Sequence, residues 1–499
     1  MKIIHLFAII MGICLLITSC GEKQTASKIY FISNTGNDQN DGSEKMPWKT
    51  LSKDNLLHIQ AGDTIFFTGG ETFDTSLVID SLVSGTSEKP VVIASRGNIP
   101  AMIRSGNEYG CRITHCKNLK MENIHFSGNG RKEGNTREGV FLSGCRNMVL
   151  SDLDIQGYQK SGLRVHLSSD IMVKKIHAHN NGFAGILVSG KHNDKTVSRN
   201  IVIRDCTASN NPGDPTALNN HSGNGILVGN STQVLIEYCT ATNNGWDMPR
   251  TGNGPVGIWA YESDSVLIQR CIAYRNKTQK GAADGGGFDF DGGMTNSIIQ
   301  YCLSYENEGA AFGLFQYESA SPWYNNTVRY CISENDGSVS PAQAAIFVWN
   351  ESDDPEKLKD CYVYNNTVYN EKGAAINYEA QSVHSNFYFC NNIFIVKDRF
   401  IHGTESKGVF EGNNWYSLSQ MKQPLKGKNN QTFAPQFKNP GRTTLTDPHL
   451  LVFLEDYQLP EASLLKTSGI DLEKNFGWLM PDQDFNGRTI LKNGIGSCQ

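Results

Sequence analysis

A short apolar pattern that recurs through the middle of the chain constrains the fold more than any other feature. Each copy reads apolar, two residues, apolar or Cys, one residue, small or apolar. By subtraction of their positions, successive copies lie 23 to 33 residues apart, with centres at Ile124, Leu153, Ile176, Cys206, Cys239, Cys271, Cys302 and Cys331. An irregular period of this length, with short strands and Gly or Asn in the turns, is typical of the coils of a β-helix.

A second strand in each repeat begins with Gly or Ala and alternates strictly. Side chains along a strand point to opposite faces in turn, so the second and fourth residues should face the core and the third and fifth should face outward. The strand starts are Gly139, Gly162, Gly185, Gly225, Gly257, Gly287, Gly313, Ala345 and Ala375. The two strand sets predict an all-β chain folded as a parallel β-helix of about ten coils. A leucine-rich repeat would need a denser leucine pattern and a shorter period.

The length and charge of the chain agree with a solenoid. The chain has 499 residues, more than one compact core normally holds. A solenoid escapes that limit because each coil packs only on its neighbours, so we expect residues 29–499 to form a single domain with an N-terminal cap. The formal net charge is −5 and no basic stripe occurs, which excludes a nucleic-acid partner. We expect a monomer.

Two residue types recur at fixed places in the coils. Cys206 to Cys331 should occupy one inward column as buried free thiols, because a stack of five cannot all pair and no metal-binding C-x-x-C spacing occurs. Asn recurs after the first strand. We expect the amides of these residues to form an internal ladder along the axis, and they are Asn180, Asn210, Asn243, Asn276, Asn307 and Asn335.

The N-terminus carries a targeting segment. Lys2 precedes an apolar run from Ile3 to Ile17, and the run ends in Thr18-Ser19-Cys20. This ending resembles a bacterial lipobox. The resemblance implies a signal peptide over residues 1–19, lipidation of Cys20, a short tether over 20–28, and anchoring to the outer membrane on its periplasmic or cell-surface face. An ordinary secretory signal or a short membrane anchor is the alternative, although the run is short for a spanning helix.

Both ends of the chain resemble a known group of enzymes. The segment from Tyr30 to Trp48, followed by the strand Ala61–Ile65, resembles the opening cap of the large right-handed β-helix family of polysaccharide-degrading enzymes. Residues 484–488 and 495–496 resemble the closing coil of that family. The resemblance implies a right-handed β-helix and a carbohydrate-active protein. It leaves the substrate open, because the family includes hydrolases, lyases and proteins without an assigned activity.

The outward positions of the Gly-started strands form one face rich in aromatic residues. Aromatic rings stack on the apolar faces of sugars, so this face predicts a glycan-binding groove. The candidate substrate-binding residues there are Trp259, Tyr261, Phe315, Tyr317 and Trp349, with Phe347 beside them. The alternative is that the long loops 189–222 and 245–255 cover these rings.

An Asp-rich segment in the centre of this face carries the strongest chemical signal. Asp289 and Asp291 share one strand face, with Cα atoms roughly 6.6 Å apart. Like charges at this distance raise one pKa, which yields the acid and the ionised carboxylate that glycosidic cleavage needs. Asp284 is a third candidate. Glu318 and Glu262, just past the neighbouring strands, are further candidates for the acid or base, and Glu262 is also a candidate for substrate binding. The alternatives are Ca²⁺ bound by the three aspartates and a purely structural role.

The spacing of Asp284 and Asp291 resembles the paired aspartates of β-helix glycosidases of the lacto-N-biosidase type. This resemblance implies hydrolysis and covers only the short segment. Arg164 and His166 lie about four coils away, on the order of 20 Å, too far to join the aspartates. They are candidates for a distal contact with an acidic sugar, or for a surface ion pair.

Three functions fit these residues. The first is a glycoside hydrolase that needs no cofactor and uses Asp289 and Asp291, with Asp284 or Glu318 as partner. The second is a polysaccharide lyase in which the aspartates hold Ca²⁺ and Lys280 or Arg275 is the base; the absence of Lys or Arg from the outward positions at the centre of the groove counts against it. The third is a lipoprotein that binds glycans without catalysis.

Overall fold

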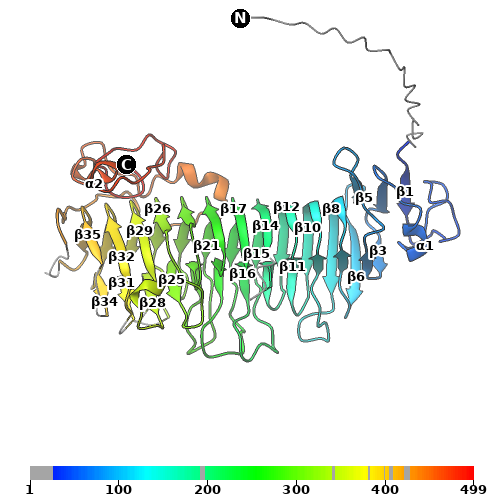
Figure 1. The fold of residues 1–499 in the computed structure, drawn as a ribbon, viewed down its shortest axis with the longest axis horizontal. Coiled ribbons are helices and arrows are strands. Elements are labelled where there is room, and N and C mark those ends of the chain that lie inside the picture. Colours follow the sequence, from blue (N-terminus) through cyan, green and yellow to red (C-terminus); the bar gives the residue numbers. More distant parts are fainter. Residues whose placement is uncertain are drawn as a thin grey trace, which may run out of the picture.

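The computed structural model describes residues 26–191, 197–339, 343–379, 382–397, 399–403, 408–420 and 427–499. Parallel strands stack coil upon coil along one axis, which runs horizontally in Figure 1. The predicted right-handed parallel β-helix is confirmed. The predicted signal peptide, Cys20 and most of the tether lie outside the described residues. Within the described part of the chain, no helix has the length and apolar character needed to cross a membrane.

The strands form a 12-stranded sheet and a 24-stranded sheet that is bent into two faces. Twelve strands in the smaller sheet correspond to slightly more coils than the ten expected. The 12-stranded sheet contains β4 (Leu77–Ile79), β7 (Cys111–Thr114), β9 (Val140–Ser143), β11 (Ser161–His166), β13 (Ala184–Ser189), β16 (Asn224–Gly229), β19 (Val256–Tyr261), β22 (Gly286–Phe290), β25 (Phe312–Gln316), β28 (Ala344–Asn350), β31 (Ala374–Tyr378) and β34 (Ile401–His402).

The bent sheet has a first face and a second face joined by one turn residue per coil. Three strands run through both faces, namely β8 (Lys117–Gly128), β10 (Arg146–Gln156) and β12 (Ser169–His179). Each bends at one residue in the left-handed conformation, with φ of 57° at Asn123, 54° at Asp152 and 52° at Lys175. The bend redirects the strand without interrupting the stacking of coils.

Other strands belong to one face only. The first face contains β1 (Ile29–Ile32), β2 (Thr64–Thr68), β5 (Val91–Arg96), β14 (Ser198–Arg204), β17 (Ser231–Glu237), β20 (Asp264–Gln269), β23 (Ile298–Gln300), β26 (Asn326–Arg329), β29 (Lys359–Tyr364), β32 (Ser385–Cys390) and β35 (Val409–Glu411). The second face contains β3 (Thr72–Asp74), β6 (Ala101–Gly106), β15 (Thr207–Ser209), β18 (Thr240–Thr242), β21 (Ile272–Tyr274), β24 (Leu303–Tyr305), β27 (Ile332–Glu334), β30 (Thr367–Asn370), β33 (Ile393–Val396) and β36 (Asn414–Ser417).

The core is a set of inward columns in which like residues stack. The five cysteines from Cys206 to Cys331 follow one another in successive coils, and each is at most 1% exposed. None of the cysteines in the described residues forms a disulfide. The prediction of buried free thiols is therefore confirmed for this column. Asn366, Asn392 and Asn413 continue it in the last coils and hydrogen-bond to one another.

The amide ladder exists, but most of the residues predicted for it are wrong by one position. The ladder runs through Asn181, Asn211, Asn244, Asn276, Asn307 and Asp336, joined by side-chain hydrogen bonds of 2.8 to 3.3 Å. Of the predicted residues, Asn276 and Asn307 belong to it. The others, Asn180, Asn210, Asn243 and Asn335, have φ between 52° and 54° and make the turn before it. Asn suits both positions, because it tolerates left-handed backbone and its amide can bond along the stack.

The C-terminal segment does not close the last coil, so that expectation is wrong. The final coil contact pairs Asn414 with Gln431. The chain then turns back and lies along the outside of the second face, in orange and red in Figure 1. The hydroxyl of Tyr301 donates to the carbonyl of Gln483 at 2.9 Å, and that of Tyr457 donates to Glu334 Oε2 at 2.5 Å. This segment contains the helix α2 (Leu472–Phe476) and the 3₁₀ turns Pro448–Phe453 and Leu464–Lys466; a further 3₁₀ turn, Pro355–Lys357, precedes β29.

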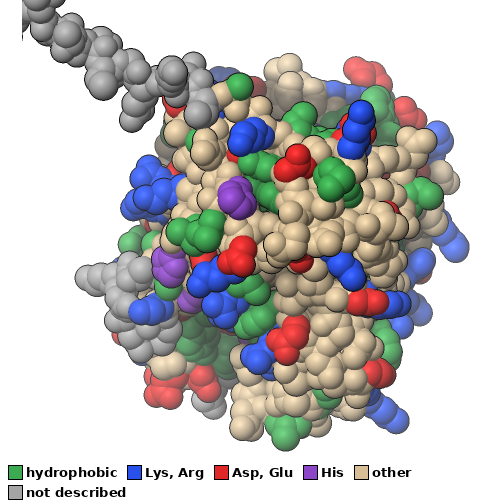
Figure 2. All heavy atoms as spheres, turned by 90° about the vertical axis from the view of Figure 1, so that its right-hand side faces the viewer, with side chains coloured by type: hydrophobic (Ala, Val, Ile, Leu, Met, Phe, Trp, Pro, Cys, Tyr) green, Lys and Arg blue, Asp and Glu red, His purple; other side chains and the backbone are tan. Residues whose placement is uncertain are grey.

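At the N-terminal end, β1 and β2 form a parallel pair, and the helix α1 (Lys53–Leu56) lies between them in the sequence. Trp48 stacks on Tyr30 with ring centroids 4.5 Å apart and is 2% exposed. The function of this segment as a cap stays a prediction. Figure 2 looks at this end of the molecule, where acidic and basic side chains are interspersed and neither sign dominates.

Removal of one ladder amide should destabilise the solenoid. Asn244 accepts from Asn211 at 2.9 Å and donates to Asn276 and to the carbonyl of Ala208, all in the buried core. Because its partners would lose their hydrogen bonds without access to water, we expect Asn244→Gly to lower the free energy of unfolding by about 2–4 kcal/mol. Chemical denaturation followed by circular dichroism measures this.

The matched control is Asn243→Gly, one residue earlier. Asn243 has φ of 52°, a conformation that glycine adopts without strain. We expect this variant to unfold within about 0.5 kcal/mol of the unmodified protein. Equal losses in the two variants would contradict the assignment of the ladder.

Candidate active site

A cavity of ≈ 460 Å³ opens on the outer side of the 12-stranded sheet, over β19, β22, β25 and β28. It contains all three candidate aspartates. The strands and the residues directly after them contribute Trp259, Asp289, Asp291, Phe315, Tyr317, Phe347, Trp349, Glu351 and Glu379. The loops contribute His221, Arg250, Asn253, Gly254, Ala283 and Asp284. This volume holds a ligand the size of a small oligosaccharide.

Strand register places the residues of this wall. Trp259 lies beside Asp289, and Asp289 lies beside Gly313, which in turn lies beside Phe347. The predicted alignment put Phe315 in the column of Asp289, and this is wrong by two residues, because β25 starts at Phe312. Gly313 has a function in this register: a Cβ there would lie 2.8 Å from Asp289 Oδ1. The glycine therefore leaves room for the carboxyl group.

Asp289 is the most deeply placed of the three aspartates. It is 3% exposed, and its Oδ1 is buried with no hydrogen-bond partner among the described residues. Burial, followed by the charges of Asp291 and Asp284, raises its pKa well above the usual range. A carboxyl group in this position keeps its proton at neutral pH, since ionisation would leave a charge without compensating contacts.

The other two aspartates are also shifted upward. Burial raises the pKa of Asp284 to about 6, against a 2.7 Å hydrogen bond from the backbone N–H of Gly254 and the charge of Arg250. Burial is also the main cause of the raised pKa of Asp291, whose Oδ1 accepts from the N–H of Gly292 at 2.7 Å. Each of these two has a donor that favours the ionised form, which Asp289 Oδ1 lacks. The site can thus hold a neutral acid beside an ionised carboxylate.

Two loop residues that the sequence pattern did not indicate complete the cavity. His221 packs edge-on against Trp259 with ring centroids 4.8 Å apart, and Asn224 Nδ2 lies 3.1 Å from His221 Nδ1. Burial and the charge of Arg250 lower the pKa of His221 to about 4, so the imidazole is neutral. Arg250 forms no ion pair with a carboxylate of the described residues and faces the cavity. Strand alternation cannot reveal such residues, because loops bring them in.

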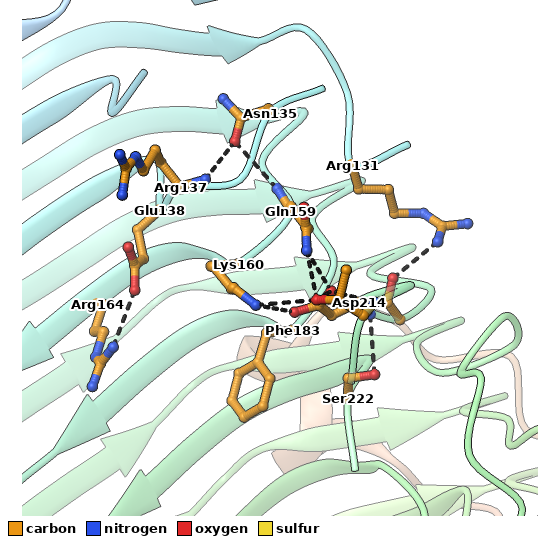
Figure 3. A network of polar contacts seen from close by, with 12 residues as sticks. Arg131, Asn135, Arg137, Glu138, Gln159, Lys160, Arg164, Phe183, Asp214 and Ser222 are labelled. Carbon is orange, nitrogen blue, oxygen red and sulfur yellow. Dashed lines mark hydrogen bonds and ion pairs between the residues drawn. The ribbon is translucent and has the colours of Figure 1, made fainter. Parts of the chain in front are cut away.

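The loops that carry these residues are held by a buried polar network (Figure 3). Asp214 is 1% exposed, and its carboxylate accepts from Lys160 Nζ at 2.5 Å and from Gln159 Nε2 at 2.8 Å. Arg131 donates to the carbonyl of Gly213 at 2.9 Å and pairs with Asp247. The segments before His221 and before Arg250 are thereby attached to loops of earlier coils.

The aromatic residues are more covered than an open groove would require. Trp259 is 3% exposed, since the loop with His221 lies over it and its Nε1 donates to Asn224 at 3.0 Å. Phe315 and Phe347 are buried, while Tyr317 and Trp349 are half-buried and line the cavity. For Trp259, the alternative of cover by a loop is therefore correct. The wall still presents rings to a ligand, mainly from Tyr317 and Trp349.

Several predicted site residues lie outside the cavity. Glu318 is exposed, and its backbone N–H donates to Glu351 at 3.0 Å. Glu262 accepts from the hydroxyl of Tyr317 at 3.1 Å and so positions that ring. Tyr261 packs beside Trp259 without lining the cavity, and Arg164 and His166 lie on β11, four strands from β22. Arg164 pairs with Glu138 at 3.1 Å, which is the predicted ion pair.

The residues proposed for a lyase base also lie elsewhere. Arg275 pairs with Glu306 at 2.7 Å at the end of β21, on the bent sheet, and Lys280 is exposed and outside the cavity lining. The outward strand positions at the centre of the groove contain no Lys or Arg, as the sequence indicated, but a loop brings Arg250 into the cavity.

The oxygen atoms of the three aspartates are not close enough together to form a Ca²⁺ site as they stand. Among the described residues, only Asp154, His177 and His179 bring three possible ligand atoms within 4.8 Å of one another, and they lie on the bent sheet. Calcium takes six to eight oxygen ligands. Asp284, Asp289 and Asp291 do not bring one ligand oxygen each within 4.8 Å of one another.

The sequence also matches a family description. A model of the Pel9A-like right-handed β-helix region matches residues 30–333, more than half of the chain. The chain belongs to the Pel9A-like right-handed β-helix family. No curated protein sequence matches this Pel9A-like chain significantly. The predicted resemblance to β-helix carbohydrate-active enzymes is thus confirmed at the level of the family.

Solved structures share the Pel9A-like fold at low identity. A GH136 lacto-N-biosidase from Eubacterium ramulus is 17% identical with a TM-score of 0.51, over 76% of this chain and 68% of that one. XylC in complex with xylose is 9% identical with a TM-score of 0.51, over 94% and 98% of the two chains. Pectate lyase Pel9A is 14% identical with a TM-score of 0.47, over 93% and 97%. At these identities the likeness concerns the fold, and the chemistry must be argued from the site.

The raised pKa of Asp289 predicts a stability effect with a defined sign. The folded protein holds this proton more tightly than the unfolded chain, so the stabilisation is complete below about pH 4 and is lost as the pH rises through the raised pKa. Asp289→Asn should therefore have a higher melting temperature than the unmodified protein at pH 8, and nearly the same one at pH 4. Differential scanning calorimetry at both pH values measures this.

Asp264 supplies the control with the opposite sign. Burial raises the pKa of Asp264, but hydrogen bonds of 2.7 Å each from Thr295 and Asn296 outweigh this effect and hold the pKa below its usual value. Asp264→Asn should lower the melting temperature at pH 8. A lower melting temperature of Asp289→Asn at both pH values would contradict the assignment of a desolvated, uncompensated carboxyl group.

Proposed function

We propose that this protein is a glycoside hydrolase that cleaves an oligosaccharide or polysaccharide bound in the cavity. The observation that carries the proposal is the pair of Asp289 on β22 and Asp291 directly after it, both with raised pKa values, in a cavity walled by aromatic rings. Glycosidic cleavage needs a protonated carboxyl group and an ionised one on either side of the scissile bond. The resemblance of the Asp-rich segment to lacto-N-biosidase-type glycosidases supports hydrolysis.

The environments of the aspartates suggest their roles. Asp289, the least exposed, is the acid that gives its proton to the oxygen of the leaving sugar. Asp291, whose ionised form is favoured by the N–H of Gly292, acts as nucleophile or as the base that activates water, with Asp284 nearby. Water supplies the hydroxyl group that ends on the anomeric carbon. Tyr317 and Trp349 stack on the sugar rings and orient the bond.

Loss of either paired carboxyl group should abolish cleavage. We expect Asp289→Asn and Asp291→Asn to lower kcat by about 10²–10⁴-fold, because each removes one proton-transfer or nucleophilic group. A panel of neutral and acidic glycans, read by reducing-end formation, measures this. Glu318→Gln is the control, since Glu318 is exposed and lies outside the cavity lining. Full activity of both aspartate variants would reject the proposal.

The same groups predict the pH dependence of hydrolysis. Asp291 must be ionised to act as nucleophile or base, and burial raises its pKa to about 7, so activity should rise with pH through this value. Another carboxyl group must keep its proton, which the raised pKa of Asp289 allows at neutral pH. We expect a bell-shaped profile of kcat/KM with its maximum above about pH 7, between the pKa of Asp291 and the higher pKa of Asp289. A profile that is flat from pH 4 to 9 would contradict this assignment.

One observation favours a polysaccharide lyase as the second candidate. Arg250, which pairs with no carboxylate among the described residues, brings a positive charge into the cavity, where it could neutralise the carboxylate of a uronic acid. In β-elimination a base removes the proton next to that carboxylate, and the glycosidic oxygen leaves with the bonding electrons. Products that absorb ultraviolet light would support this candidate, and their loss with a chelator would restore Ca²⁺ as a cofactor. If the protein binds glycans but forms no cleavage product, the third function, glycan binding without catalysis, is supported.

Attachment to the outer membrane forms part of the proposal. A lipid on Cys20 and the tether over residues 20–28 would hold the solenoid at the membrane while its cavity meets glycans. Cys20→Ser should move the protein from the membrane fraction to the soluble fraction.

A further inference from the structure

A group of three side chains lies on the second face of the bent sheet, away from the sheet that carries the cavity. We propose that Asp154, His177 and His179 bind a divalent transition-metal ion such as Zn²⁺. This site is separate from the proposed glycan-cleaving centre and does not depend on it.

Strand geometry brings the three residues together. His177 and His179 are two residues apart on β12, so both point outward, and their rings stack with centroids 4.2 Å apart. Asp154 lies on β10 directly opposite His177 in the strand register. The rigid ladder between these strands therefore fixes the relative positions of all three Cα atoms.

The distances between the ligand atoms are already close to those of a metal site. Asp154 Oδ2 lies 3.0 Å from His177 Nδ1, and Asp154 Oδ1 lies 3.2 Å from His179 Nε2. The three chosen ligand atoms all lie within 4.8 Å of one another. Tetrahedral Zn²⁺ with bonds of about 2.0–2.2 Å separates its ligands by about 3.4 Å. Small side-chain rotations thus suffice, and water would occupy the remaining position because His177 is exposed.

The outer nitrogens of both rings have partners that orient them. His177 Nε2 lies 3.2 Å from Ser209 Oγ, and Asn180 Nδ2 lies 2.8 Å from His179 Nδ1. A histidine that ligates a metal donates its other ring N–H. Ser209 Oγ can accept from His177 Nε2, and Asn180 accepts from His179 Nδ1 once its amide turns its oxygen toward the ring. Two imidazoles with one carboxylate favour Zn²⁺, Cu²⁺ or Ni²⁺ over Ca²⁺ or Mg²⁺, which prefer oxygen.

A simple ion pair is the competing explanation. The two histidines hold the pKa of Asp154 below its usual range, although burial opposes them, and a protonated histidine would account for these contacts without a metal. His449 and Asp205, at 2.9 Å, form such a pair with a single histidine. Metal binding and proton binding exclude each other at the same ring nitrogens. A metal site therefore predicts saturable Zn²⁺ binding by the histidines, and a simple ion pair predicts none.

Calorimetry on the chain from residue 21, freed of metal, tests the site. We expect Zn²⁺ to bind with a stoichiometry near one and to raise the melting temperature, while Ca²⁺ does neither. His177→Ala and His179→Ala should each weaken Zn²⁺ binding by at least about 10-fold, because each removes a direct ligand. His449→Ala, at the pair with one histidine, should bind Zn²⁺ as the unmodified protein does.

Two results would overturn the proposal. One is the absence of saturable Zn²⁺ binding, which would leave Asp154 and the histidines as an ion pair. The other is binding that the double variant His177→Ala/His179→Ala retains, or a Co²⁺ derivative with a thiolate charge-transfer band, since either would place the metal on other residues. Glycan cleavage should be unchanged in these variants, so failure here and failure of the hydrolase proposal are separate outcomes.

Discussion

The structure depends on the hydrogen bonding of each parallel strand to the equivalent strand of the next coil. This spacing of about 4.8 Å places equivalent residues of successive coils in contact. Like residues therefore stack, as the cysteines from Cys206 to Cys331 and the amides from Asn181 to Asn307 do. The amide ladder satisfies its own donors and acceptors inside the core, so polar side chains are buried at little cost. One left-handed residue per bend lets the strands change direction while this contact continues.

The same register creates the site. Asp289 lies on β22 and Asp291 directly after it, and both carboxyl groups reach the cavity on the outer face. The neighbouring Gly313 leaves the space that Asp289 occupies. Asp289 is almost fully buried, and its Oδ1 has no hydrogen-bond partner among the described residues. This environment favours the protonated form of Asp289, and a proton donor at neutral pH requires such an environment. The cost is a lower stability of the folded protein when the carboxyl group ionises. The site for which we propose Zn²⁺ uses the same rule, with two histidines alternating on β12 and an aspartate one coil away.

The loops decide what the scaffold can bind. Lys160 and Gln159 hold the buried Asp214, and Arg131 pairs with Asp247, so segments from different coils meet over Trp259. They turn an open aromatic face into a cavity, and they bring in His221 and Arg250. A neutral imidazole and an unpaired guanidinium beside the acidic strand give the cavity polar contacts that the sheet alone lacks. For the proposed glycan-cleaving function, we therefore expect the loops rather than the solenoid to set the specificity among sugars.

The sequence by itself determined the architecture, the outward direction of Asp289, Asp291 and Trp259, and the buried cysteine column, because strand alternation and a repeated period are local properties. It could not separate adjacent positions that accept the same residue type, so the ladder was predicted at Asn243 instead of Asn244. Gly313 was likewise predicted to start its strand, although it pairs with Asp289, and this shifted the predicted place of Phe315 by two residues. Only the tertiary structure decided which loop residues enter the cavity, that Glu318 stays outside it, and that the C-terminal segment packs along the flank. These outcomes depend on contacts between residues far apart in the chain, for which the repeat period carries no information.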